Sequence, residues 1–285
     1  MSESCSSSCS SCSSASSCGG SCPSGAAAEP QKTQAQQLSN IKNVIVVMSG
    51  KGGVGKSSFS SLIAIALQKM GKKVGILDGD ITGPSIPKLF GVKGLPEVSE
   101  YGAYPLKSKG GISIMSMNLM LQNEEEPVVW RGPVISGVIK QFWEEVIWGE
   151  LDYLVVDLPP GTGDAPLTIL QTLPVSGVIV VTSPQDLSNM VVRKGIKMLE
   201  MMKIPVLGIA ENMSYFECPD CGKHVNIFGE SKVNETCQKY QVPLIGKFPL
   251  DPEISRLGDL GQIEDYHGKV LDILAENLPD FLPQE

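Results

Sequence analysis

The chain has 285 residues, 42% of them hydrophobic, and a formal net charge of −8. This length suits one large α/β domain with a small appendage, and the acidic balance argues against non-specific nucleic-acid binding, which needs a basic face. No apolar run of about 18 residues occurs, so the sequence predicts no membrane span. The N-terminus lacks the basic and apolar regions of a secretory signal. We therefore expect a cytoplasmic protein that binds neither nucleic acid nor membrane.

Residues 1–37 form a low-complexity segment of Ser, Cys, Gly, Ala and Gln with almost no large apolar side chain. Such a composition cannot bury enough surface to fold alone, so we predict disorder unless a ligand orders the segment. It nevertheless contains five of the eight cysteines of the chain: Cys5, Cys9, Cys12, Cys18 and Cys22. Without a secretory signal, this pattern favours metal or redox chemistry over disulfides, and the spacing fits iron–sulfur or zinc. The alternative is a flexible tail with incidental thiols.

Residues 50–57 fit the phosphate-binding pattern G-x-x-x-x-G-K-[ST]. Its glycines let backbone N–H groups point at phosphate oxygens, while Lys56 supplies a positive charge and the Ser57 hydroxyl can hold Mg²⁺. A strand predicted over 43–48 and a helix over 58–70 place the phosphates at a helix N-terminus. The predicted nucleotide-binding residues here are Gly50, Lys51, Gly52, Gly53, Val54, Gly55, Lys56, Ser57 and Ser58.

Carboxylates follow two other predicted strands, at the edge where α/β sheets bind ligands. The strand over 74–77 runs into Asp78 and Asp80, of which one could orient a water on the γ-phosphate and the other could support Mg²⁺. Helix capping or turn formation is the alternative for such aspartates. A later buried strand ends in Asp157, the Walker B position that serves Mg²⁺. The loop over 159–164 could report whether a γ-phosphate is present.

Strands and helices alternate through the remaining domain. We expect strands over 112–117, 177–182 and 205–210, and helices over 133–148, 187–202 and 233–240. This alternation predicts an α/β fold with a doubly wound, mostly parallel sheet of the P-loop NTPase type. We divide the chain into the Cys/Ser-rich segment, 1–37, and a P-loop ATPase domain, 38–285.

The nucleotide base is predicted to be bound at the end of the strand over 205–210. Asn212 follows that strand, where its amide can read a purine edge, and Pro249 and Asp251 lie where they could close the base pocket. The sequence contains no N-K-x-D guanine motif, so we predict that the nucleotide is ATP.

Cys218 and Cys221 form a C-x₂-C turn that offers two thiolates at metal-binding distance. Zinc or a cubane cluster normally takes about four ligands. The remaining ligands could be His224 and Cys237 of the same chain, as in a zinc ribbon, or the same pair from a second subunit. Cys237 falls in a predicted helix and is interpreted as a packed thiol.

Several motifs together resemble one family. K-G-G-V-G-K-S is similar to the deviant Walker A of the MinD/ParA/nitrogenase-iron-protein class. Within that class, the chain resembles the Mrp/Nbp-type iron–sulfur cluster carriers and scaffolds. The motifs that carry this resemblance are D-G-D-I-T-G-P-S at 78–85, W-R-G-P at 130–133, D-L-P-P-G-T-G-D at 157–164, S-P-Q-D at 183–186 and E-N-M-S-Y-F-x-C-P-x-C-G at 211–222. The resemblance spans roughly residues 40–260, and motifs of this length are rarely matched by chance.

The resemblance implies a homodimer in which Lys51 reaches the nucleotide of the other subunit. It implies that Asp80 helps hydrolysis and that Asp157 serves Mg²⁺. It further implies a [4Fe–4S] cluster bridged between two chains by Cys218 and Cys221.

The run Cys9-x₂-Cys12-x₅-Cys18 is similar to the N-terminal cluster motif of the eukaryotic scaffolds, although Cys5 lies closer to it than the upstream cysteine of that motif usually does. We therefore expect a slow ATPase that carries a [4Fe–4S] cluster to apo iron–sulfur proteins, with ATP and Mg²⁺ as cofactors.

Other functions of this fold class make different demands on the sequence. A positional ATPase of the MinD/ParA kind would need a C-terminal amphipathic helix or a basic DNA-binding face, and neither is visible. A zinc-holding targeting ATPase would need a large helical insertion, for which the motif spacing leaves no room. A nitrogenase-like reductase has its ligand cysteines in other contexts.

Overall fold

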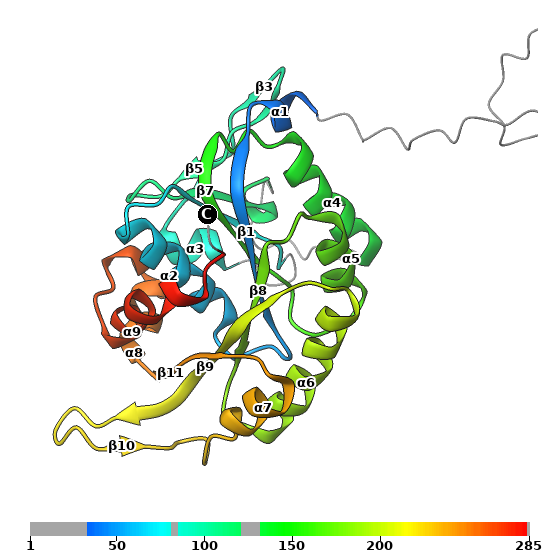
Figure 1. Ribbon diagram of the computed structural model, residues 1–285. Helices are drawn as coiled ribbons and strands as arrows, with labels where there is room; N and C mark the ends of the chain where they lie inside the picture. Colours follow the sequence, from blue (N-terminus) through cyan, green and yellow to red (C-terminus); the bar gives the residue numbers. More distant parts are fainter. Residues whose placement is uncertain (1–32, 81–84, 121–131, 284–285) are drawn as a thin grey trace, which may run out of the picture. The chain divides into compact units, whose positions relative to one another are not determined.

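The computed structural model describes residues 33–80, 85–120 and 132–283 (Figure 1). Within these residues, one sheet has the strand order β10-β9-β8-β1-β7-β2-β6-β5, with β11 paired to β9, and β3 and β4 form a separate ribbon. The strands are β1 (Asn40–Ser49), β2 (Val74–Asp78), β3 (Val98–Ser99), β4 (Gly102–Ala103), β5 (Leu106–Lys107), β6 (Ser113–Ser116), β7 (Glu150–Asp157), β8 (Gly177–Thr182), β9 (Val206–Glu217), β10 (His224–Val225) and β11 (Leu244–Pro249).

The helices fill the connections between these strands. They are α1 (Gln34–Gln37), α2 (Lys56–Lys69), α3 (Ile86–Phe90), α4 (Gly132–Glu145), α5 (Asp164–Thr172), α6 (Asp186–Met201), α7 (Val233–Tyr240), α8 (Pro252–Asp259) and α9 (Lys269–Asn277), with 3₁₀ turns η2 (Met117–Met120), η3 (Ile263–Asp265) and η4 (Leu278–Phe281). None of the helices in the described ranges combines the length and apolar character needed to cross a membrane.

β1 occupies the middle of the sheet, parallel to β7 on one side and to β8 on the other. Its apolar residues alternate between the two faces: Ile45 and Val47 join one core, whereas Val44, Val46 and Met48 join the other. A strand buried on both faces reads as a continuous β-branched run, which is how this stretch appears in the sequence.

Helices cover both faces of the sheet, as Figure 1 shows. The core that contains Ile45 is closed by α2, α3, α8 and α9, and the core that contains Val46 is closed by α4, α5, α6 and α7. The predicted doubly wound, mostly parallel sheet of the P-loop NTPase type is therefore confirmed. Antiparallel pairing in the main sheet is confined to its ends, at β5–β6 and β9–β10.

Some elements differ from the prediction. β9 does not end near residue 210 but continues to Glu217, because β10 and β11 pair with its second half. The short helices α5, α8 and α9 are additional, and each is at most nine residues long, with too few turns for a clear periodic signal.

The N-terminal segment 1–37 is predicted to lack structure, yet its last residues form α1. Thr33 caps this helical turn by accepting a hydrogen bond from the Gln36 backbone N–H at 3.2 Å, and the Gln36 side chain accepts one in return from the Thr33 N–H at 3.0 Å. Ala35 is buried. The capping box explains why this polar stretch is ordered. Residues 1–32 lie outside the described residues.

Candidate functional site

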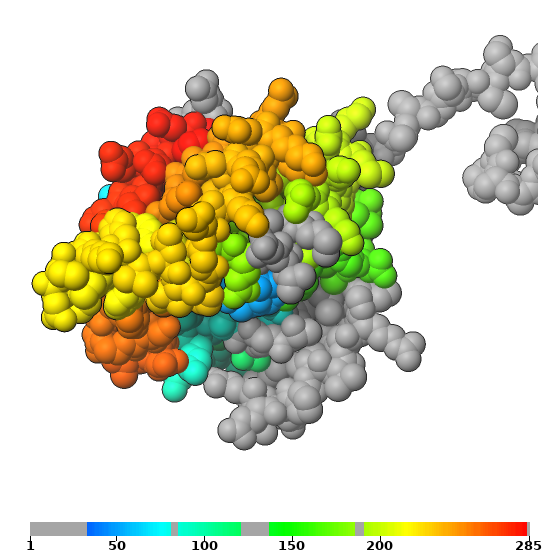
Figure 2. All heavy atoms as spheres, turned by 90° about the horizontal axis from the view of Figure 1, so that it is seen from below, coloured from blue at the N-terminus to red at the C-terminus, as the bar shows by residue number. Residues whose placement is uncertain are grey.

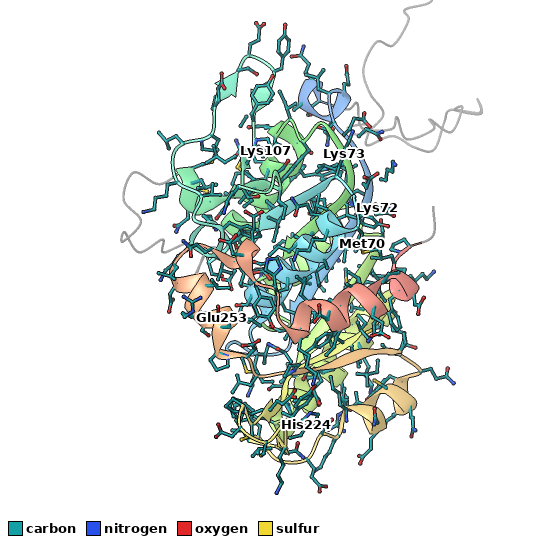
Figure 3. The ribbon with its side chains drawn as sticks, turned by 90° about the vertical axis from the view of Figure 1, so that its left-hand side faces the viewer. Met70, Lys72, Lys73, Lys107, His224 and Glu253 are labelled. Atoms are coloured by element: carbon teal, nitrogen blue, oxygen red, sulfur yellow. The ribbon has the colours of Figure 1, made fainter. Side chains whose placement is uncertain are left out.

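The residues predicted to bind nucleotide gather where the parallel strands end. Asp78 at the end of β2 is paired in register with Asp157 at the end of β7, and the phosphate loop (residues 50–57) follows β1 directly. The candidate site therefore occupies the carboxyl edge of the sheet, the ligand-binding edge of open α/β folds. Lys73, which precedes β2, marks the opposite edge, and Figure 3 shows it far from His224 on the β9–β10 hairpin.

The phosphate loop turns on two glycines in the left-handed conformation, Gly53 at φ 80° and Gly55 at φ 77°. Gly55 is the N-cap residue of α2, so the orphan N–H groups at that helix start face the loop. A Cβ atom at Gly55 would lie 2.5 Å from Asn212 Nδ2, so this position also needs the absence of a side chain.

Lys56 lies inside this loop with 6% of its side chain exposed. Its Nζ lies 2.8 Å from Asp157 Oδ2 and 3.9 Å from Asp80 Oδ2. Asp157 also accepts hydrogen bonds of 2.6 Å from Ser57 Oγ and from Ser60 Oγ. The structure thus brings together the lysine, serine and both carboxylates that the sequence nominated.

Asp78 lies behind this group and is fully buried. It accepts hydrogen bonds from the Asp80 backbone N–H at 3.1 Å and from Ser116 Oγ at 3.2 Å. Burial, reinforced by repulsion from Asp157, raises the pKa of Asp78 to about 8. Asp78 is therefore suited to holding the Asp80 backbone in place, whereas Asp80, which is only partly buried, can face a ligand.

These residues fit a magnesium–nucleotide complex. Ser57 Oγ and Asp157 Oδ2 lie 2.6 Å apart and are oxygen ligands of the kind that Mg²⁺ prefers. Asp80 lies close to them, because its Oδ2 is 3.9 Å from Lys56 Nζ. The glycine turn and the start of α2 supply backbone N–H groups for phosphate, and Lys56 supplies the positive charge.

Lys51 does not point into its own phosphate loop. Its Nζ donates a hydrogen bond to Gln185 Oε1, in the loop that precedes α6. The loop after β7 also contacts this region, because the Gly161 backbone N–H donates to Ser49 O at 2.8 Å.

A pocket of about 60 Å³ adjoins the start of α2 and is a candidate base site. Asn212 Nδ2 donates a hydrogen bond of 2.9 Å to Val54 O, which ties the end of β9 to the phosphate loop. The pocket brings together Asn212, Pro249 and Asp251, the residues predicted for the base pocket. It is also lined by Gly55, Ser58, Phe59, Leu62, Met213, Leu250, Ile254 and Ser255.

Cys218 and Cys221 lie in the tight turn between β9 and β10. The Cys218 N–H donates to Lys223 O at 3.0 Å and the Gly222 N–H donates to Cys218 O at 2.8 Å, so the hairpin holds both cysteines in one turn. Backbone hydrogen bonds from Asp220 and Cys221 lower the pKa of Cys218 below that of an ordinary thiol. In Figure 2 the hairpin forms a lobe at the left of the view.

Neither intrachain candidate joins this pair. The His224 ring stacks on Tyr215, with centroids 4.1 Å apart, and Cys237, on α7, packs against the core that contains Val46. Burial raises the pKa of Cys237, as expected for a packed thiol. Across residues 33–80, 85–120 and 132–283, no group of three or more His, Cys, Asp or Glu side chains is placed to hold a metal ion.

Other predicted residues lie outside the described ranges. These are the five N-terminal cysteines Cys5, Cys9, Cys12, Cys18 and Cys22, residues 81–84 of the D-G-D-I-T-G-P-S motif, and the Trp130-Arg131 part of the W-R-G-P motif.

Sequence reasoning did not identify several residues that support the site. Ser60 holds Asp157, Ser116 holds Asp78, and Gln185 accepts from Lys51. Ser60 lies one helical turn after Lys56, near the start of the helix predicted after the phosphate loop, and Gln185 lies within the S-P-Q-D motif, so spacing and motif could have indicated both. Ser116 gives no such signal, because its contact depends on the pairing of β2 with β6.

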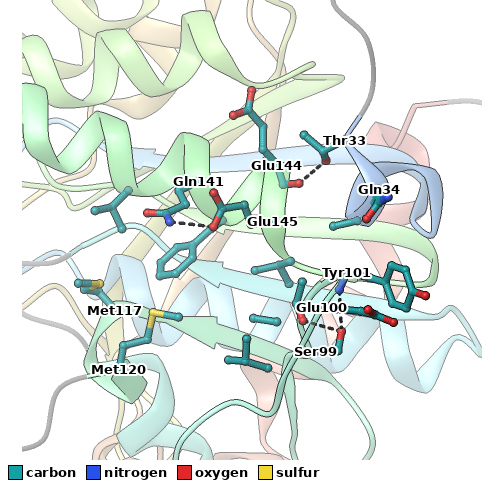
Figure 4. Close-up of a pocket in the computed structure, with 17 residues that line it drawn as sticks. Thr33, Gln34, Ser99, Glu100, Tyr101, Met117, Met120, Gln141, Glu144 and Glu145 are labelled. Atoms are coloured by element: carbon teal, nitrogen blue, oxygen red, sulfur yellow. Dashed lines mark hydrogen bonds between the residues drawn. The ribbon is translucent and has the colours of Figure 1, made fainter.

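A largely apolar groove of about 460 Å³ lies between α4 and the β3–β4 ribbon (Figure 4). Residues that precede β1 and β7, such as Ala35 and Val146, line it together with Phe142 and Met117. Glu100, Glu144 and Glu145 are its charged lining residues in the described part of the chain. It contains none of the predicted nucleotide or cluster residues.

Comparison with known proteins shows which proteins the chain is similar to. The chain is 48% identical over 228 residues to the iron–sulfur cluster carrier protein of Methanocaldococcus jannaschii, covering 79% of each chain. It is 47% identical to a solved nucleotide-binding protein from Archaeoglobus fulgidus in complex with ADP, with a TM-score of 0.73 over 81% of this chain and 91% of that one. The fold is shared with the cell-division ATPase MinD of Pyrococcus furiosus, which is 20% identical. The TM-score is 0.62, over 85% of this chain and 100% of that one. The ParA model, described as NUBPL iron-transfer P-loop NTPase, matches residues 40–276, and the chain belongs to this family.

Proposed function

We propose that this protein is an ATP-dependent carrier that holds a [4Fe–4S] cluster through Cys218 and Cys221 and transfers it to apo iron–sulfur proteins. One observation carries the proposal: β9 contributes Asn212 to the candidate base pocket and ends immediately before the two-thiol turn. The name of the M. jannaschii relative, iron–sulfur cluster carrier protein, supports the same function. Free thiols that serve a cluster need a reducing compartment, for which we propose the cytoplasm.

The cluster would lie on a two-fold axis between two copies of the chain. One turn supplies two thiolates, whereas a cubane cluster takes about four, and a second copy completes the set. The cysteine hairpin also exposes large apolar side chains, with Val225 46% exposed, Ile227 51% and Phe228 36%. Apolar side chains beside two ligand cysteines support a dimer contact at this place.

The Cys218 thiol is suited to cluster binding because the thiolate is the ligand form, and the backbone hydrogen bonds that lower its pKa favour that form. The turn is partly to fully exposed, so an incoming apo protein could approach it.

The nucleotide site would supply the driving force as a slow ATPase. Lys56 and the loop N–H groups would bind the phosphates, and Ser57 with Asp157 and Asp80 would hold Mg²⁺, which neutralises phosphate charge when it is bound. Asp80 would also orient the attacking water. Lys51 would leave Gln185 and reach the nucleotide of the other subunit, so that hydrolysis depends on the dimer.

The N-terminal cysteines Cys5, Cys9, Cys12, Cys18 and Cys22 would hold a second cluster, with a subset as ligands. Their segment would become ordered around that cluster because its composition offers no core of its own. The division into a segment of 1–37 and an ATPase domain of 38–285 belongs to this proposal.

The cluster assignment is tested in the full-length chain with the five N-terminal cysteines replaced by Ser, so that only the hairpin site remains. After anaerobic reconstitution with iron and sulfide, we expect about four iron atoms per dimer. Adding C218A and C221A should remove the iron and shift the protein toward monomer in sedimentation. Cys237→Ala is the matched control and should change neither result. A cluster that persists without the hairpin pair, or one full cluster per monomer, would contradict the bridged site.

The N-terminal cluster is tested by removing residues 1–32, which leaves the Thr33 cap and α1 in place. The shortened protein should keep its ATPase activity and bind less iron than the full chain. Equal iron content in both would rule out a cluster at the N-terminal cysteines.

A further inference from the structure

Glu211 is a buried carboxylate next to the candidate base pocket for which the proposed function gives no role. Its side chain is fully buried on β9, between Thr182 of β8 and Lys247 of β11 in the strand pairing. Ser214 Oγ donates to Glu211 Oε2 at 2.6 Å, whereas Glu211 Oε1 has no hydrogen-bond partner among the described residues. A buried carboxylate with an unpaired oxygen is unfavourable, so its presence calls for an explanation.

The Glu211–Ser214 bond spans a strained residue. Met213 has φ 57°, the left-handed conformation that side chains other than glycine and asparagine rarely adopt. Ser214 Oγ also donates to the Glu211 backbone oxygen, at 3.1 Å. The single hydroxyl proton is thus shared between the carboxylate and backbone oxygens of Glu211, and this three-centre hydrogen bond closes a short turn around Met213 and offsets its backbone strain.

This turn positions the side chains of Glu211, Asn212 and Met213. Asn212 faces the phosphate loop, where its Nδ2 donates to Val54 O, and both Asn212 and Met213 line the base pocket. Glu211 faces the other side of the sheet, close enough to Cys237 for its charge to contribute to the raised pKa of that thiol. Glu211 thus lies outside the base pocket, but its hydrogen bond with Ser214 positions Asn212 and Met213, which form part of the pocket wall.

We propose that Glu211 and Ser214 are positioning residues for recognition of the nucleotide base. The hydrogen-bonded turn that they form around Met213 fixes the Asn212 amide at the pocket wall, so the preference for adenine over guanine depends on it. This inference rests on the proposed nucleotide site, and it extends recognition of the base to residues that do not touch it.

The test measures binding of Mg–ATP and Mg–GTP to the full-length chain by calorimetry, together with KM and kcat for ATP. Ser214→Ala should lower the ATP-over-GTP affinity ratio by about fivefold, the equivalent of one ordinary hydrogen bond. Its kcat at saturating ATP should stay near that of the parent, because Lys56 and Asp80 are untouched. Glu211→Gln keeps an oxygen that can accept from Ser214 and should retain the ratio, whereas Glu211→Ala should lower it as Ser214→Ala does.

Asn212→Ala separates this inference from the base pocket on which it rests. If Asn212→Ala lowers the ratio but Ser214→Ala and Glu211→Ala leave it unchanged, the positioning role is wrong and the pocket assignment stands. If Asn212→Ala also leaves the ratio unchanged, both the base pocket and the positioning role are wrong. A general loss of folding would lower affinity for the two nucleotides equally, so the ratio isolates the role of the turn.

Discussion

Lys56 Nζ lies 2.8 Å from Asp157 Oδ2, and both side chains are almost completely withdrawn from solvent. The pair links the phosphate loop to the end of β7 and neutralises two charges that would be costly to bury alone. Both partners can exchange this contact for charges of Mg–ATP, since the lysine suits phosphate and the carboxylate suits Mg²⁺. The ion pair therefore holds the phosphate loop against the end of β7, and the charges of a bound ligand can replace the contact between Lys56 and Asp157.

Lys56→Ala should destabilise the protein and abolish nucleotide binding. Removing one partner of a buried ion pair costs about 3 kcal/mol or more, although Ser57 and Ser60 continue to donate to Asp157. Adding Asp157→Asn should restore much of the free energy of unfolding without restoring binding. Urea denaturation and calorimetry measure the two effects, and a Lys56→Ala protein as stable as the parent would contradict the buried pair.

Ser60→Ala should weaken Mg²⁺-dependent nucleotide binding, because Ser60 Oγ donates to Asp157 Oδ1 at 2.6 Å in a fully buried position. We expect about a tenfold loss in apparent Mg²⁺ affinity and about 2 kcal/mol of stability. Ser61→Ala is the matched control, since Ser61 Oγ donates only to the Ser57 backbone oxygen. A magnesium titration of ATP binding compares the two, and equal curves would show that Ser60 does not orient Asp157.

Gly55→Ala and Gly53→Ala separate backbone strain from steric conflict in the phosphate loop. Both glycines are left-handed, so either substitution costs about 1–2 kcal/mol. At Gly53 the added Cβ meets nothing within 4 Å, whereas at Gly55 it would lie 2.5 Å from Asn212 Nδ2. Thermal melts and ATP titrations should show the larger loss of stability and binding for Gly55→Ala, and similar losses would argue against the contact with Asn212.

Asp80→Ala should slow ATP hydrolysis while ATP still binds. Asp80 lies 3.9 Å from the Lys56 ammonium and is partly exposed, where it can face a bound nucleotide. Loss of a group that orients the attacking water lowers kcat by about 10²- to 10⁴-fold. Single-turnover assays with saturating ATP report this directly. Normal hydrolysis by the variant would remove the assigned role.

The two kinds of thiol should respond differently to pH. The pKa of Cys218 is lowered by backbone hydrogen bonds, so its thiolate forms at a lower pH than in an ordinary cysteine, whereas burial raises the pKa of Cys237. In cluster-free protein, iodoacetamide should therefore modify Cys218 first, and Cys237 only as the pH rises further. Peptide mass spectrometry across a pH series distinguishes the sites, and identical pH profiles would contradict the hairpin geometry.

The phosphate loop and its flanking strand and helix could be predicted because local sequence determines them. Gly53 and Gly55 mark the turns, and the helical spacing of the following apolar residues marks α2. The roles of Asp157 and Asp80 could be proposed for the same reason, since each follows a buried strand.

The supporting contacts could not be derived in this way, because they depend on strand pairing or on a disfavoured backbone conformation. Ser116 meets Asp78 only because β6 pairs with β2, and Glu211 meets Ser214 only because Met213 takes a left-handed conformation that its residue type disfavours. Periodicity reports which face of an element is buried, but not which polar groups meet across neighbouring strands.

The position of β1 between β7 and β8 has a consequence for synthesis of the protein. Ser57 and Asp157 are 100 residues apart, and β1 pairs with strands that are made only after residue 149. At about 5–20 residues per second, a nascent chain presents its phosphate loop roughly 5–20 s before the carboxylate that completes the site. During that interval the central apolar strand has neither neighbour, so we expect the half-made protein to depend on ribosome-associated chaperones. Nucleotide binding is then a property that the chain acquires only after most of the domain has been translated.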